Sequence, residues 1–71
     1  MSIMETVKEY LDDQLENASR MPNHARYFTD VALGGINLAC RLLDKNHDYE
    51  SSEALEDLWD NKYRVLFSQF Y

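Results

Sequence analysis

The amino-acid sequence predicts an all-α fold, a compact three-helix up-down-up bundle that forms a single domain over residues 1–71. Three observations predict it. Three stretches repeat apolar residues with the period of an α-helix, short turn signals separate them, and no stretch alternates apolar and polar residues as a strand does. The expected helices span about 2–20, 23–45 and 52–70, and their short connections favour antiparallel neighbours.

The first expected helix, residues 2–20, begins with a capping box and ends before a proline. Ser2 and Glu5 have the spacing in which each side chain accepts a hydrogen bond from the backbone N–H of the other residue. The apolar residues then fill an arc of about 140° on a helical wheel. Pro22 disfavours helical geometry at Met21. This pattern indicates an outer helix with one buried face.

The second expected helix, residues 23–45 with Asn23 as its N-cap, is the most apolar of the three. Its apolar positions sweep an arc of about 240°, whereas a surface helix needs a stripe of only about 100°. It is therefore expected to be the central helix of the bundle, covered on more than one side.

Two adjacent glycines, Gly34 and Gly35, raise the alternative of a break or kink, because each interior glycine costs up to about 1 kcal/mol relative to alanine. The apolar period continues in phase across the pair, which favours a continuous, at most kinked, helix. Gly35 lies near the middle of the apolar arc with Ala32 and Ala39 on either side, so these three residues are the expected point of close helix crossing. Packing gives no reason for Gly34.

The third expected helix, residues 52–70, follows a turn in which Asn46 is expected to take a left-handed C-cap conformation. Ser51 or Ser52 is the expected N-cap. The apolar residues cover an arc of about 220°, more than one core-facing stripe requires. Because large apolar surfaces usually mark interfaces, this surplus predicts a two-fold homodimer formed through the third helix and part of the second. The expected interface residues are Tyr63, Val65, Phe67, Phe70 and Tyr71.

The formal net charge of −6 is concentrated towards the two ends of the chain. Residues 1–21 carry five acidic and two basic side chains, and residues 46–71 carry six acidic and two basic ones. This balance argues against nucleic-acid binding, which needs a basic footprint on the phosphates. The densest acidic surface comprises Asp48, Glu50, Glu53, Glu56, Asp57 and Asp60. It is either a solvated face or a surface that docks on a basic protein, including one that normally holds nucleic acid.

No residue pattern indicates catalysis, a metal or a cofactor. On a continuous helix His24 and His47 lie about 35 Å apart, and Cys40 lies about 24 Å from His24 and about 10 Å from His47. These separations exceed the hydrogen-bond reach that a Cys–His nucleophile needs. His47 with its acidic neighbours lacks the closely spaced ligands of a zinc site. We therefore expect neither enzyme activity nor a cofactor.

A single cysteine excludes an intrachain disulfide and suits a reducing compartment. No signal peptide and no apolar run of about 18 residues is visible, so we expect a cytoplasmic protein that does not enter the membrane. The sequence thus predicts a small non-enzymatic protein–protein interaction module or regulator that acts as a homo-oligomer. The alternative is an acidic inhibitor of a basic host protein, by analogy with small acidic helical proteins encoded by mobile elements.

Overall fold

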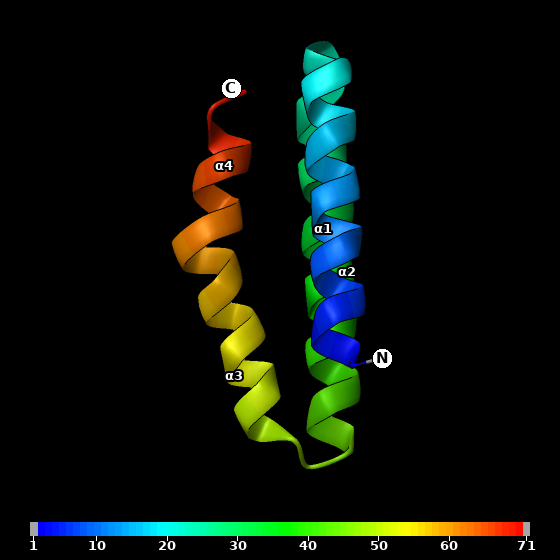
Figure 1. Cartoon of the computed structure of the whole chain (residues 1–71), viewed down its shortest axis with the longest axis vertical. Helices are drawn as coiled ribbons and strands as arrows, with labels where there is room; N and C mark the ends of the chain where they lie inside the picture. Colours follow the sequence, from blue (N-terminus) through cyan, green and yellow to red (C-terminus); the bar gives the residue numbers. More distant parts are fainter. Residues whose placement is uncertain (1, 71) are drawn as a thin grey trace.

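The computed structural model describes residues 2–70 of the 71-residue chain, which contain helices and turns but no strand. The elements are α1 (Ile3–Arg20), a 3₁₀ turn (Pro22–His24), α2 (Ala25–Lys45), α3 (Tyr49–Leu58), a π-helical turn (Trp59–Tyr63) and α4 (Arg64–Ser68). The last three continue into one another, so that residues 49–68 form a single helical rod beside α1 and α2 (Figure 1). The three rods form a compact body of 38 × 21 × 15 Å. The prediction of an all-helical fold with three helices is confirmed.

The first helix begins and ends where local sequence signals place its boundaries. The Ser2 hydroxyl oxygen accepts a hydrogen bond from the Glu5 backbone N–H at 3.1 Å and so caps the N-terminus of α1. At the other end Arg20 is the last helical residue, and the Met21 N–H donates to the Asn17 carbonyl at 2.9 Å. Pro22 then starts the 3₁₀ turn, because its fixed φ suits the first helical position and its missing N–H leaves no donor unpaired there.

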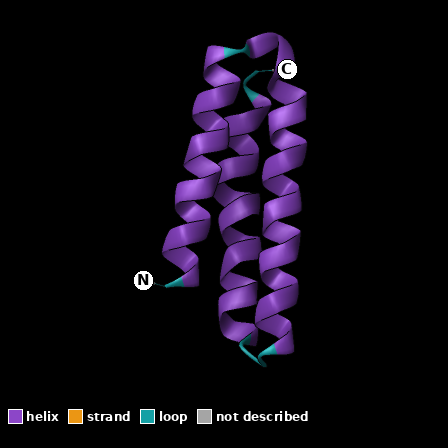
Figure 2. Cartoon of the chain, turned by 90° about the vertical axis from the view of Figure 1, so that its right-hand side faces the viewer, coloured by secondary structure: helices purple, strands orange, loops and turns teal. Residues whose placement is uncertain are grey.

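The start of α2 differs from the sequence prediction. Asn23 lies inside the 3₁₀ turn and does not cap α2, whose preceding residue, His24, makes no side-chain capping bond. The proline nucleates one turn before α2, and this turn leads directly into the helix (Figure 2). Within α2 the helix is continuous from Ala25 to Lys45, so the pair of glycines does not break it. Its buried residues are Ala25, Ala32, Ile36, Ala39, Cys40 and Leu43.

The turn between α2 and α3 also corrects two predictions. Asn46 has a φ of −90°, and the left-handed conformation is taken by His47, with a φ of 60°. The Asn46 side chain instead donates a hydrogen bond to the Leu42 carbonyl at 3.0 Å. Asp48 caps α3 by accepting from the Ser51 N–H at 3.2 Å, so the third rod begins at Tyr49 and neither serine is its cap. An aspartate caps as well as a serine and comes first along the chain.

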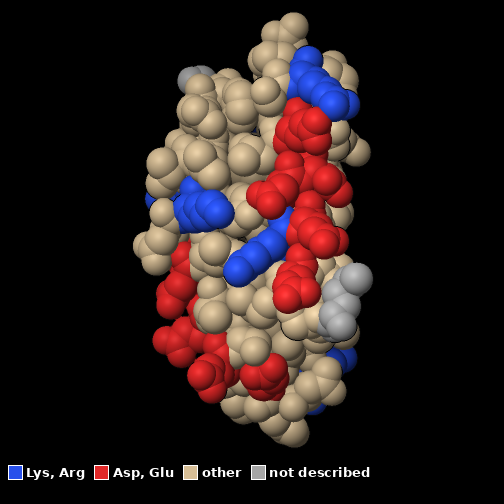
Figure 3. All heavy atoms as spheres, viewed as in Figure 1, with Lys and Arg blue, Asp and Glu red and all other residues tan. Residues whose placement is uncertain are grey.

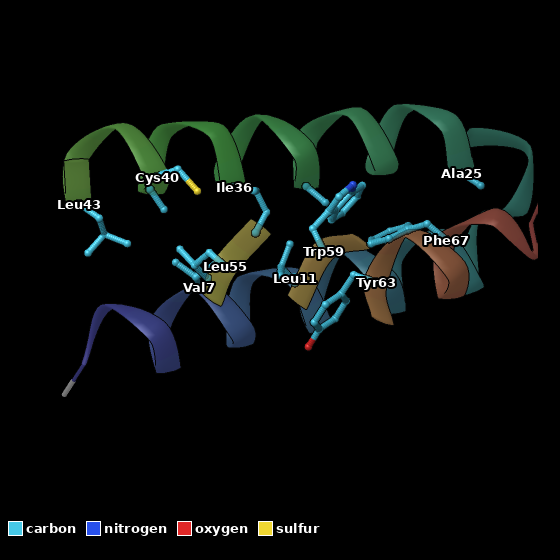
Figure 4. Packing of buried hydrophobic residues seen from close by; sticks show 13 residues of the cluster. Val7, Leu11, Ala25, Ile36, Cys40, Leu43, Leu55, Trp59, Tyr63 and Phe67 are labelled. Atoms are coloured by element: carbon cyan, nitrogen blue, oxygen red, sulfur yellow. The ribbon is translucent and has the colours of Figure 1, made fainter. Parts of the chain in front are cut away.

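The π turn keeps the apolar side chains of the third rod on one side. Leu55, Trp59, Tyr63 and Phe67 follow one another at steps of four residues, and all four are buried. In an ideal α-helix each such step advances about 40° beyond a full turn, so the row would drift around the helix. A π turn takes more residues for each turn and cancels much of this drift. In Figure 4 Trp59 and Phe67 lie beneath α2, and the Tyr63 ring points away from α2.

Candidate interaction surfaces

Two of the five residues predicted to form the interface lie in the core of the chain itself. Tyr63 is 1% exposed and Phe67 is 0% exposed. The prediction that they belong to an exposed interface is therefore wrong. The wide apolar arc on which it rested assumed α-helical geometry throughout, whereas the π turn rotates the residues after it back towards the core.

The other three predicted interface residues do not form one exposed surface in the described part of the chain. Val65 is 61% exposed on α4, and Phe70 is partly buried against the core. Tyr71 lies outside the described residues 2–70. Apart from Val65, the third rod thus contributes little exposed apolar surface among these positions.

A partly buried hydrogen bond joins the third rod to α1. The Tyr63 hydroxyl donates to Asp12 Oδ1 at 2.6 Å. Burial, followed by this hydrogen bond and the negative charge of Asp12, raises the pKa of Tyr63 to about 12. The tyrosine therefore stays protonated and acts as a structural donor over the whole physiological range.

Four exposed apolar side chains lie together on α1 and α2. Leu38 is 60% exposed and Leu42 is 50% exposed on α2, and Ile3 is 46% exposed on α1. Together with Tyr10, which is 37% exposed, they form what we call the α1–α2 face. Between Ile3 and Leu42 runs a shallow groove of about 400 Å³. The residues that line this groove are Ser2, Ile3, Thr6, Val7, Gly35, Leu38, Ala39 and Leu42.

The predicted helix-crossing residues lie beneath and beside this groove. Ala32 is 0% exposed, and Ala39 is buried at the base of the groove. A Cβ placed on Gly35 would lie 2.6 Å from Cε2 of Tyr10, so the tyrosine ring occupies the space that a side chain would need. A Cβ on Gly34 would meet nothing within 4 Å. The two adjacent glycines therefore stand in different environments.

The predicted acidic surface is exposed at all six of its positions, Asp48, Glu50, Glu53, Glu56, Asp57 and Asp60. Of these six residues, only Asp60 has an ion-pair partner within residues 2–70, the Arg64 side chain at a long distance of 3.9 Å. Figure 3 shows the acidic side chains in two bands on this side of the molecule, one over α1 and one over α3. The band on α1 was not part of the predicted surface, although the acidic residues of 1–21 already indicated a solvated face.

The groups with chemical reactivity are held in structural roles or stand alone. The Cys40 thiol is buried and donates to the Ser52 carbonyl at 3.6 Å, and burial raises its pKa above the ordinary value. His47 Nδ1 lies 3.1 Å from the Tyr49 hydroxyl on the exposed turn. Residues 2–70 contain no group of three His, Cys, Asp or Glu side chains arranged to hold a metal ion.

Comparisons with protein-family models, with curated proteins and with solved structures found no match to this chain. Within the described residues, no helix combines the length and the apolar character needed to cross a bilayer.

Proposed function

We propose that this up-down-up bundle is a non-enzymatic protein–protein interaction module that acts as a homodimer through the α1–α2 face. The observation that carries the proposal is the grouping of Leu38, Leu42 and Ile3 around an apolar groove, each of them about half exposed. Isolated exposed apolar residues are normal on protein surfaces, but a contiguous group usually marks a binding surface.

The size of the chain supports self-association. A domain of about 60 residues buries only about 60% of the surface that its unfolded chain exposes, so its own core supplies limited stabilisation. Complete burial of a leucine-sized side chain contributes about 1.5–3 kcal/mol. Covering Leu38 and Leu42 with a second copy would add such contributions twice, because a two-fold interface uses the same surface on both subunits.

A pair of matched variants tests this function. Leu38→Asp places a charge on the α1–α2 face, and Val65→Asp places the same charge on α4 at a position of nearly equal exposure, 60% against 61%. We expect the native chain and Val65→Asp to be dimers by light scattering after gel filtration, and Leu38→Asp to be a monomer with unchanged helix content. A native chain that remains monomeric at tens of micromolar contradicts the proposal.

A second candidate function rests on a different observation, the two acidic bands on one side of the molecule (Figure 3). They suit an inhibitor that docks on a basic protein surface, such as one that normally binds nucleic acid. The test is capture of a basic protein from the source cell by the native chain and by the triple variant Glu56→Lys, Asp57→Lys, Asp60→Lys. Capture that weakens steeply with salt and is lost in the variant supports this function, and capture that is indifferent to both contradicts it.

A further inference from the structure

Gly34 lies in the interior of α2 without a reason in the chain itself. The helix is continuous through it, and a Cβ at this position would meet nothing within 4 Å. By helical spacing it lies about 180° from the centre of the buried residues of α2, so it faces directly away from the core. A glycine in a helix interior costs up to about 1 kcal/mol relative to alanine. Only a close approach from outside would make use of the missing side chain.

Apolar side chains lie on both sides of Gly34 along the outward face of α2. Towards the N-terminus stands Tyr27, which is 65% exposed, followed by the partly buried Val31. Towards the C-terminus stand Leu38 and Leu42, which are 60% and 50% exposed. The stripe thus continues on both sides of the glycine and offers apolar side chains along its whole length to a second copy.

The charges along the same stripe are not symmetric but complementary. Asp30 lies before Gly34, whereas Arg41 and Lys45 lie after it, and all three side chains are exposed. Among residues 2–70 none of the three has an ion-pair partner. Asp30 and Arg41 are about 16 Å apart along one helix, so they cannot pair within one chain. A parallel arrangement of two α2 helices would set like charges against each other, and an antiparallel one would set Asp30 against Arg41.

We propose that the second copy packs antiparallel on α2, with the two helices crossing between the levels of Gly34 and Leu38. In this arrangement Leu38 of each copy lies over Gly34 of the other, and Arg41 of each copy lies beside Asp30 of the other. The apolar groove between α1 and α2 borders this contact and is extended by it. The inference rests on the proposed self-association and adds to it the contact surface, the direction and the register.

Charge exchange is the direct test of this register. Asp30→Arg and Arg41→Asp each place like charges opposite one another at two symmetric contacts, so each is expected to raise the dissociation constant of the dimer about tenfold or more. The double variant restores opposite charges and is expected to return the constant to near the native value. Asp57→Arg and Arg64→Asp make the same changes of charge on the third rod and are expected to leave association unchanged.

The outcomes separate the two proposals when association is measured by sedimentation equilibrium. The antiparallel register is supported if each single variant dimerises more weakly than the native chain and the double variant regains native association. The register is overturned, but the homodimer is not, if the native chain dimerises and the double variant does not regain native association. The same conclusion follows if the single variants dimerise as well as the native chain. A native chain that is monomeric overturns both.

A second variant checks the crossing point independently of charge. Gly34→Leu adds a side chain where the isolated chain has open space, so each monomer should fold as before. In the dimer the same side chain would meet Leu38 of the other copy. We expect unchanged helix content together with a loss of dimer of about tenfold or more. Undiminished association of Gly34→Leu overturns the packing of Leu38 over this residue.

Discussion

The ring of Tyr10 lies against Gly35, so close that a Cβ on the glycine would stand 2.6 Å from Cε2 of the ring. The contact brings the middle of α1 close to the middle of α2, and it makes Gly35 a packing requirement. Gly34, its neighbour in sequence, has no such contact. Substitutions at the two positions can therefore distinguish the effect of a side chain on packing from its effect on helix propensity.

We predict opposite effects on stability for substitution at the two glycines. Gly35→Leu should lower the free energy of unfolding by about 1–3 kcal/mol, because the side chain must displace Tyr10 or force the two helices apart. Gly34→Ala should raise it by up to about 1 kcal/mol, because alanine favours the helix and meets nothing. Urea denaturation of dilute protein, followed by circular dichroism, measures both. Equal effects at the two positions would contradict the contact with Tyr10.

Removal of the Tyr63 hydroxyl should weaken the attachment of the third rod to α1. Tyr63→Phe keeps the buried ring and loses only the hydrogen bond to Asp12. We expect a loss of about 1 kcal/mol in the free energy of unfolding at neutral pH. Tyr49→Phe, which removes the hydroxyl of an exposed tyrosine, is the matched control and should change stability little. A native-like stability of Tyr63→Phe would show that the hydrogen bond does not hold the rods together.

The same tyrosine predicts a pH dependence. The pKa of Tyr63 is raised from about 10 in the unfolded chain to about 12 in the folded one. Because the unfolded chain loses this proton first, the contribution is complete below about pH 10 and is lost as the pH rises towards 12. Comparison of the native chain with Tyr63→Phe over this range isolates the effect from that of the other tyrosines. The difference in stability between the two proteins should shrink as the pH rises.

Deletion of one residue from the π turn should be tolerated. Removal of the exposed Asn61 lets residues 59–63 adopt α-helical geometry and leaves Tyr63 and Phe67 on the core-facing side. The helix α2 contains no π turn that could absorb a deletion. Removal of the exposed Asn37 therefore rotates Cys40 and Leu43 by about 100° relative to the residues before the deletion. Thermal unfolding should therefore show a small change for the first deletion and a large loss of stability for the second. Similar losses in both would count against this account of the turn.

The Cys40 thiol should react slowly while the chain is folded. Burial hinders access and also raises the thiol pKa, so little reactive thiolate is present at neutral pH. Mass spectrometry after treatment with iodoacetamide should show slow modification in buffer and rapid modification in denaturant. Rapid modification in buffer would show that the helices around Cys40 open readily.

Local signals in the sequence predict the helix boundaries well where one residue decides them. Ser2 and Pro22 delimit α1, as expected from their hydrogen-bonding capacity and fixed backbone geometry. Prediction of the capping residue fails where several neighbouring residues could take the same position. Asp48 caps α3 in place of the serines that follow it, and His47 adopts the positive φ that was expected at Asn46.

The interaction surface could not be predicted in the same way. A helical wheel places Tyr63 and Phe67 on the exterior because it assumes a constant turn, and the π turn is not visible in the apolar pattern itself. The exposure of Leu38 and Leu42 depends on how α2 is rotated between α1 and the third rod. A wide apolar arc shows that a helix has more than one covered side, but it does not show which edge of the arc stays open.

The two glycines of α2 are expected to respond differently to selection for folding and to selection for activity. Position 35 is sensitive to the interior of a single chain, and position 34 is open to whatever approaches from outside. In a library of random substitutions, selection for folding alone should exclude bulky residues at 35 and accept them at 34. The proposed dimer predicts that selection for activity in the cell excludes them at 34 as well. Under the proposed dimer, substitutions at position 34 thus test association separately from folding.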